Sequence, residues 1–292
     1  CIVDFIKELG GSTRYCFHSH TEFCDGRAQM EAFAREAVAR GFTHYGFSPH
    51  SPLRFHSPCN MLEANVPRYL AEVARINREH GASCRFYAGM EIDYIDDTWG
   101  PAITYFRQLP LDFRIGSVHF IPTKNGRFVD VDGSPERFCR YVKELFDSDI
   151  RYVVETFYRQ SRRMVLAGGF DFIGHFDKVG LNASAWQPGI EEEDWYRALV
   201  DELVDLIIDR RVAVEVNTKI YAKTAPSDAV GHPAGAPAGT GRFFPAERHL
   251  ARLKAAGIPI LVNSDAHVPA LIDASRAEAL ALLASLPLRL AE

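Results

Sequence analysis

The feature that most constrains the fold is a regular alternation of short apolar runs and amphipathic segments along the whole chain. The segment RAQMEAFAREAVARG, residues 27–41, places its apolar side chains on one helical face and ends at Gly41, and the apolar run THYGF follows it. Such an alternation predicts parallel strands with helices packed outside them. We therefore expect an α/β fold forming one domain over residues 1–292, since closed α/β barrels of about 250 residues are single domains.

One segment interrupts this alternation. Residues 222–241, AKTAPSDAVGHPAGAPAGTG, are rich in Ala, Gly and Pro and contain no apolar run. A connection of this length is uncommon in a compact domain unless it has a function. We expect a mobile lid or an irregular excursion there.

Metal-capable side chains stand at the ends of the predicted strands. In a parallel barrel the carboxyl ends of the strands meet on one face, so residues far apart in the sequence converge there. An HxH pair alone is weak evidence for a metal site, but six of the eleven histidines occupy such strand ends. The polar residues at these ends are His18, His20, His50, Glu91, His119, His175, Asn217, Asp265 and His267, and Asp25 follows His20 by five residues. Imidazole combined with carboxylate favours zinc, iron or manganese, whereas oxygen ligands alone would favour calcium or magnesium.

The same segments resemble a known family. HSHTEFCDG, GFSPHSPL, GMEIDY, GSVHF, IGHFD, EVNT and NSDAH follow one another in the order of the motifs of the polymerase and histidinol phosphatase (PHP) family, and they are most similar to its histidinol-phosphatase branch. Position 26 is Gly, where many members of that branch have His, and Asp25 matches other branches instead.

The resemblance implies a fold and a set of metal ligands. The fold is a distorted (β/α)7 barrel, similar to a TIM barrel, with two to three divalent transition-metal ions at the C-terminal strand ends. The resemblance assigns the first ion to His18, His20, Glu91 and Asp265, the second to Glu91, His119 and His175, and the third to Asp25, His50 and His267.

The predicted chemistry is hydrolysis of a phosphomonoester. Three divalent ions exceed the charge of three carboxylates, and the resulting positive field suits a phosphate dianion. A bound metal lowers the pKa of water to about 7, and no phosphoenzyme motif such as DxDxT is present. We expect attack by a metal-bridging hydroxide on L-histidinol phosphate, within histidine biosynthesis, with Glu91, Asp265 and His267 as catalytic residues.

Three other functions stay open at this point. A PHP enzyme could act on nucleotides or nucleic-acid ends, although no Lys/Arg run is present and the net charge is −5. An amidohydrolase-type barrel also opens with HxH, but it normally has a bridging lysine where this chain has Glu91. A barrel that binds metal or ligand without catalysis would keep the same residues and differ only in an assay.

Four residues are candidates for contact with the substrate. Arg159, which resembles the arginine of the family's YYR segment, could bind phosphate oxygens, or it is a solvated helix charge. His56 follows His50 on the catalytic face. Asp93 could recognise an amine, or it orients a ligand histidine. Asn217 completes the set at its strand end, whereas His249, in a helix, is expected to be solvated.

Composition limits the partners and the location. No apolar stretch reaches the roughly 18 residues of a membrane span, and CIVDFIKELGG is too short and too acidic for a signal peptide. The six cysteines form no CxxC pair and are expected to be reduced thiols. We therefore expect a soluble, cytoplasmic protein with a small phosphorylated substrate, no nucleic-acid or membrane partner, and an oligomeric state that the sequence leaves open.

Overall fold

The computed structural model describes residues 8–221 and 241–287. Seven parallel strands form one sheet in the order β1-β2-β3-β4-β7-β8-β9. Their bounds are Tyr15–Cys16, His44–Phe47, Arg85–Asp93, Phe113–Ser117, Phe172–Ile173, Ala213–Asn217 and Ile260–Asn263. The interrupting segment proposed as a lid lies, except for Gly241, outside the described residues.

The sheet curls until its two edge strands meet. Ser19 and Ala266, just beyond β1 and β9, form a parallel bridge, and the His20 amide donates to the Ala266 carbonyl at 2.9 Å. Deeper between β1 and β9, a side chain takes the place of a backbone hydrogen bond: the Asn263 side-chain oxygen accepts from the Phe17 backbone N–H at 2.9 Å. The result is a nearly closed, distorted (β/α)7 barrel, which confirms the predicted fold class.

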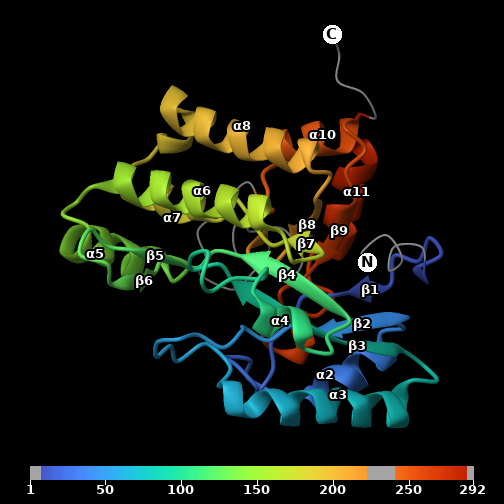
Figure 1. Ribbon diagram of the computed structural model, residues 1–292. Helices are drawn as coiled ribbons and strands as arrows, with labels where there is room; N and C mark the ends of the chain where they lie inside the picture. The colour runs from blue at the N-terminus through green and yellow to red at the C-terminus, as the bar shows by residue number, and fades with distance from the viewer. Residues whose placement is uncertain (1–7, 222–240, 288–292) are drawn as a thin grey trace.

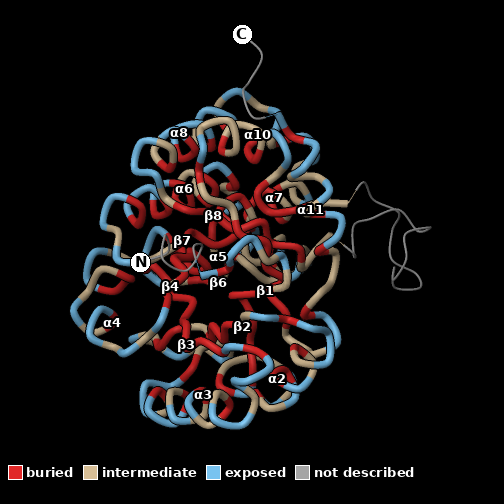
Figure 2. The backbone as a smooth tube through the Cα atoms, turned by 90° about the vertical axis from the view of Figure 1, so that its right-hand side faces the viewer, coloured by how far each residue is buried: buried red, intermediate tan, exposed pale blue. Residues whose placement is uncertain are grey.

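Helices cover the outside of the sheet in two groups (Figure 1). One group is α2 (Met30–Ala39) and α3 (Val66–His80), and α4 (Thr104–Gln108) follows β3. The other consists of α6 (Ile150–Ala167), α7 (Val179–Trp186), α8 (Asp194–Asp209), α10 (Glu247–Ala255) and α11 (Arg276–Ser285). Figure 2 shows the consequence, with buried strands at the centre and exposed segments mainly around them.

The connection from β4 to α6 is more elaborate than the sequence pattern predicts. An antiparallel hairpin of β5 (Phe120–Pro122) and β6 (Phe128–Asp130) precedes α5 (Pro135–Leu145). The Gln160 side chain on α6 donates to the carbonyls of Tyr94, Ile95 and Phe120 at 3.0 to 3.2 Å. This one amide therefore ties α6 to the segment after β3 and to the start of β5.

The lower barrel interior is filled by aromatic rings. Phe113 packs against Phe17 and Phe172, with ring centroids 5.5 Å and 6.1 Å apart. Gly89 makes room for this ring, since a Cβ built at that position would lie 2.1 Å from Phe113. The residues of this cluster, which we call the aromatic floor, are Leu9, Tyr15, Phe17, Tyr87, Phe113, Ile115, Phe172, Ala213 and Leu261.

Two further expectations from composition can be compared with the structure. Among the described residues, no helix combines the length and the apolar character that a membrane crossing requires. The five cysteines in the described part of the chain are free thiols.

Candidate metal centre

Glu91, near the end of β3, lies at the centre of the histidine cluster and is fully buried. Its Oε2 is 3.2 Å from His18 Nε2, 3.0 Å from His50 Nδ1 and 3.5 Å from His20 Nε2. Its Oε1 faces the other way, 3.0 Å from His175 Nε2 and 3.3 Å from His119 Nε2. The two oxygens of this carboxylate thus lie close to two separate groups of imidazoles, as a ligand that bridges two metal ions requires.

Asp265 and Asp25 complete the cluster on the side of β9. Asp265 Oδ1 lies 3.1 Å from His20 Nε2. Asp25 Oδ1 lies 3.3 Å from His267 Nε2 and 3.7 Å from His50 Nε2. Asp265 has a φ of 49°, in the left-handed region that non-glycine residues rarely occupy. Such a strained backbone persists where the surrounding structure holds it, and it is frequent at functional sites.

Several ligand atoms of the cluster have no hydrogen-bond partner in the protein, as is expected where cations bind. His18 Nε2, His20 Nε2, Asp25 Oδ1 and both oxygens of Glu91 are buried and lack a hydrogen-bond partner. Leaving so many buried polar atoms unsatisfied in one place is costly unless another group binds them. Four overlapping sets bring their ligand atoms within 4.8 Å of one another: His20 with Asp25, His50 and His267; His18 with His20 and Asp265; His18 with Glu91 and His175; and His50 with Asp93 and His119.

The electrostatics keep the carboxylates ionised. Burial opposes ionisation of Glu91, but the neighbouring His18, His119 and His50 hold the pKa of this carboxyl well below its usual range. Burial likewise opposes ionisation of Asp265, and Lys219 together with His18 lowers its pKa. Both side chains are therefore available as anionic ligands at neutral pH.

Two buried carboxylates orient the histidines from behind. Glu215, in β8, accepts from His18 Nδ1 at 2.9 Å, and Asp93 accepts from His119 Nδ1 at 2.6 Å. A hydrogen bond at Nδ1 leaves the Nε2 lone pair free for a metal and fixes the ring orientation. Glu215 also accepts from the Asn263 amide at 3.0 Å and from the His175 N–H at 3.1 Å.

Sequence analysis missed Glu215, although the signal was present. It shares strand parity with Asn217 in the motif EVNT, so an inward-facing carboxylate at the next position down the barrel was predictable. Its burial beneath His18 depends on the curvature of the barrel, which the sequence pattern does not reveal.

Two predicted substrate contacts, Asn217 and Asp93, are buried and hydrogen-bonded to other protein groups. Asn217 is 1% exposed, and its amide donates to Glu215 Oε1 and Asp265 Oδ2, both at 3.1 Å. Asp93 is fully buried and accepts from the Asn60 amide at 3.0 Å in addition to His119. The polar atoms of both residues are engaged by protein partners, which favours a role in orienting the ligands, the alternative already considered for Asp93. Substrate contact by Asn217 and Asp93 stays a prediction.

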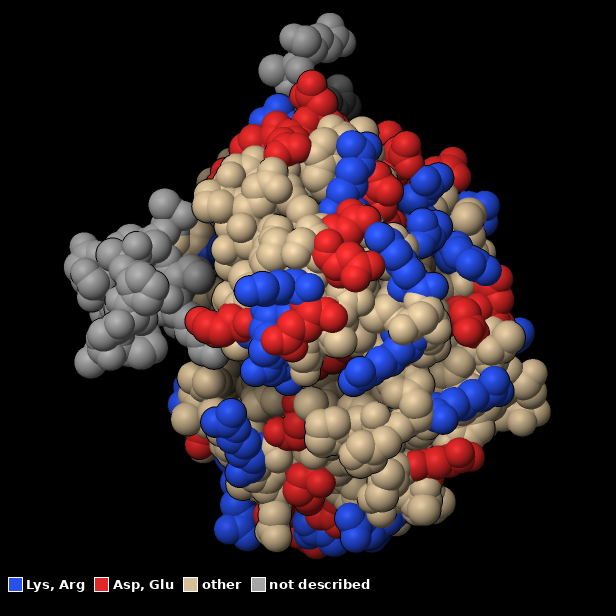
Figure 3. All heavy atoms as spheres, turned by 90° about the vertical axis from the view of Figure 1, so that its left-hand side faces the viewer, with Lys and Arg blue, Asp and Glu red and all other residues tan. Residues whose placement is uncertain are grey.

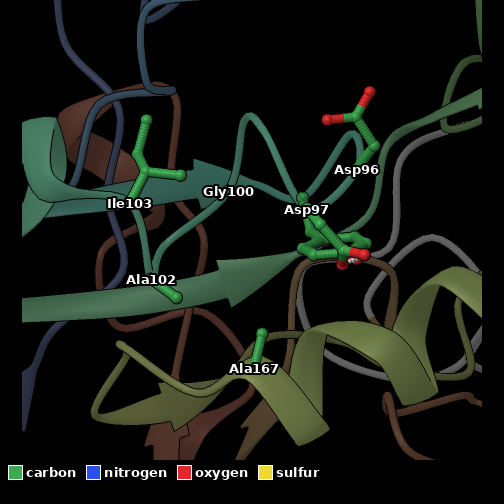
Figure 4. Close-up of a pocket in the computed structure, with 7 residues that line it drawn as sticks. Asp96, Asp97, Gly100, Ala102, Ile103 and Ala167 are labelled. Atoms are coloured by element: carbon green, nitrogen blue, oxygen red, sulfur yellow. Dashed lines mark hydrogen bonds between the residues drawn. The ribbon is translucent and has the colours of Figure 1, made fainter.

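Arg159 and His56 are exposed. Arg159, on α6, donates to Thr156 Oγ1 at 2.9 Å and lines a cavity of about 230 Å³ together with Asp96 and Phe128. A second cavity, of about 160 Å³, also includes Asp96 and lies between the loop after β3 and the end of α6 (Figure 4). Neither cavity is lined by a candidate metal ligand, and substrate contact by Arg159 and His56 stays a prediction.

The expectation for His249 is wrong. Its side chain is 4% exposed and its ring lies 6.3 Å from the ring of Phe176, where the sequence pattern favoured a solvated position. Burial, together with Arg248 and Arg252, lowers its pKa to about 4. The ring is therefore neutral at pH 7, and its Nε2 accepts from Arg248 Nε at 3.2 Å.

Comparison with known proteins agrees with this geometry. The family model described as PHP domain matches residues 17–219. A histidinol-phosphatase of Bacillus subtilis (strain 168) is 26% identical over 275 residues, covering 86% of this chain and 92% of the relative.

Solved structures share the fold. The crystal structure of a candidate histidinol phosphatase from Listeria monocytogenes has a TM-score of 0.72 at 17% identity, covering 90% of this chain and 99% of that chain. The histidinol phosphate phosphatase of Lactococcus lactis, solved in complex with zinc, L-histidinol and phosphate, has a TM-score of 0.64 at 18% identity and covers 94% of each chain.

Proposed function

The chain belongs to the PHP domain family, and we propose that it is a metal-dependent phosphomonoesterase that hydrolyses L-histidinol phosphate to L-histidinol and phosphate. The observation that carries this proposal is the position of Glu91, whose two oxygens face separate groups of histidines. We infer the identity of the substrate from the Bacillus and Lactococcus relatives, which are histidinol phosphatases. We further propose that residues 1–292 act as one catalytic domain, in the cytoplasm, within histidine biosynthesis.

We assign the ligands by their donor atoms. The side chains that would hold two to three ions of zinc, iron or manganese are His18, His20, Asp25, His50, Glu91, His119, His175, Asp265 and His267. Bound ions would lower the pKa of water and polarise a phosphate ester, which makes hydrolysis possible at neutral pH. We assign catalysis to Glu91, Asp265 and His267.

The exposure of the ligand side chains indicates the side from which substrate reaches the cluster. The side chains of His50, His267 and Asp25 are 12%, 19% and 27% exposed, whereas those of Glu91 and His18 are 0% exposed. Substrate therefore approaches from the side of the three partly exposed ligands. Water is excluded below by the aromatic floor, so the charged groups act in a medium of low polarity, where their interactions are stronger.

A small substrate also suits the surface charge. Figure 3 shows one face of the molecule, on which Lys and Arg side chains are interspersed with Asp and Glu. A strand-binding groove would favour a continuous basic track with aromatic platforms. The alternative, a PHP phosphoesterase acting on nucleotides or nucleic-acid ends, keeps the same metal centre and differs only in what the rim recognises.

Phosphate release from a substrate panel tests the proposal. The panel contains L-histidinol phosphate, AMP, p-nitrophenyl phosphate and the diester bis-p-nitrophenyl phosphate, assayed with metal content determined on the same sample. We expect the highest kcat/KM for histidinol phosphate and loss of activity with a chelator. A preference for the nucleotide or the diester would favour the alternative, and activity indifferent to chelation would contradict a metal enzyme.

A further inference from the structure

Two lysines stand at the ends of neighbouring strands, and the proposed function has not yet used either. Lys178 follows β7, three residues after His175, and Lys219 follows β8, two residues after Asn217. Because β7 and β8 are adjacent in the sheet, both lysines lie on the same side of the metal-ligand cluster.

Lys219 reaches into the cluster itself. Its Nζ lies 3.2 Å from Asp265 Oδ1 and 3.5 Å from His267 Nε2. Its backbone N–H donates to Asn217 Oδ1 at 3.1 Å, which holds the start of the loop in place. The side chain is 28% exposed, so the ammonium group stands between a buried ligand carboxylate and the open rim.

Lys178 is held more tightly and lies deeper. Its Nζ is 2.7 Å from Asp132 Oδ2, and its side chain is only 11% exposed. Its charge also acts on Asp265 and Glu91, and the charge of Lys219 acts on Asp132. The two ammonium groups therefore share an electrostatic environment, in which Asp132 and Asp265 are common partners.

Charge balance indicates what these ammonium groups bind. When Asp265 serves as a metal ligand, Lys219 is left beside bound cations with its counter-charge already engaged. Asp132 carries one negative charge and is paired with Lys178, so it does not neutralise both lysines. A dianion at the rim would balance this excess, and each ammonium has hydrogen-bond donors to spare.

We propose that Lys178 and Lys219 bind the oxygens of the substrate's phosphate group from the β7–β8 side of the cluster. This inference rests on the proposed phosphomonoesterase function and deepens it. Lys219 contacts the phosphate at the rim, and Lys178 contacts it from below while Asp132 holds the lysine side chain in place.

Calorimetric titration of inorganic phosphate into the metal-loaded protein tests the inference apart from turnover. We expect Lys219→Met and Lys178→Met each to weaken phosphate binding about 10-fold to 100-fold, the loss typical of a charge-assisted contact, with metal content unchanged. Lys219→Arg keeps the charge and is expected to recover most of the affinity. Lys143→Met is the matched control, because Lys143 is exposed on α5.

A second variant distinguishes phosphate binding by Lys178 from a purely structural role of its ion pair with Asp132. Asp132→Asn breaks the ion pair but leaves the ammonium group, so we expect phosphate affinity to be retained. Equal losses in Asp132→Asn and Lys178→Met would mean that Lys178 only supports the loop.

Two other outcomes would overturn the inference: unchanged phosphate affinity in both lysine variants, or loss of metal in them. If the parent protein binds phosphate and hydrolyses p-nitrophenyl phosphate but not histidinol phosphate, the proposed substrate fails while the lysine assignment stands.

Discussion

The lower and upper halves of the barrel interior are built on the same strands but obey opposite rules. On β3, Tyr87 packs in the aromatic floor, and Glu91, two inward-facing positions further along the strand, is the centre of the ligand cluster. On β8, Ala213 belongs to the floor and Glu215 supports His18. The floor has close-packed rings, whereas the upper half leaves buried donor atoms without partners.

The difference shows how a metal centre of this kind is held together. Several ligand atoms of the cluster are buried without a hydrogen-bond partner, so the rest of the protein has to hold the ligands in place. The packed floor fixes the strand positions, and the carboxylates behind the histidines fix the rings. The comparison predicts that changes in the upper half cost metal and activity, whereas changes in the floor cost stability.

The largest effect is expected for Glu91→Ala. Within the described part of the chain, this change removes the only side chain whose two oxygens face two groups of histidines, so we expect loss of at least one bound ion and a fall in kcat/KM of more than about 1000-fold. Elemental analysis and phosphate release measure the two effects. Asp25→Ala is the comparison, with loss of about one ion expected, and a smaller metal loss in Glu91→Ala than in Asp25→Ala would contradict the bridging position.

In the floor, Phe113→Ala is expected to lower the free energy of unfolding by about 3–5 kcal/mol, because it leaves a cavity beneath the ligands. Urea denaturation of the metal-loaded protein measures the loss. Leu166→Ala, at a position 52% exposed, is the control, with a change within about 0.5 kcal/mol expected. The division between the two halves fails if Phe113→Ala reduces metal content in folded protein as strongly as a ligand variant does.

Glu215→Gln tests the support of the histidine rings. Glutamine keeps the shape but removes the negative charge that faces His18 Nδ1, so we expect metal affinity to fall about 10-fold to 100-fold. Competition with a metal-chelating dye measures the affinity. Glu247→Gln, exposed on α10, is the matched control, and identical affinities in the two variants would show that Glu215 has no part in metal binding.

The smallest effect at neutral pH concerns a buried histidine outside the ligand cluster. Because the pKa of His249 is lowered to about 4, the folded state prefers the neutral ring. Its contribution to stability is present above pH 6.5 and is lost as the pH falls towards 4, in all about 3 kcal/mol, since one pKa unit corresponds to about 1.4 kcal/mol. Denaturation of apoprotein between pH 4 and 7 is expected to show a shallower pH dependence in His249→Gln, and an unchanged slope would refute the assignment.

The sequence by itself determined the fold class and the convergence of the nine candidate ligands. Both follow from local patterns, because apolar runs alternating with amphipathic helices define a parallel barrel, and a barrel brings its strand ends together. The order of the motifs around His18, Glu91 and Asp265 was sufficient to expect a metal centre.

Only the tertiary structure decided which polar residues stand behind the candidate ligands and which groups they contact. Asn217 and Asp93 are at strand ends like the ligands, yet their contacts with Glu215 and His119 engage their polar atoms. His249 is buried beside the Phe176 ring, which follows β7, and the charges of Lys178 and Lys219 both act on Asp132. Such pairings depend on distances between elements remote in sequence, which no local pattern of residues encodes.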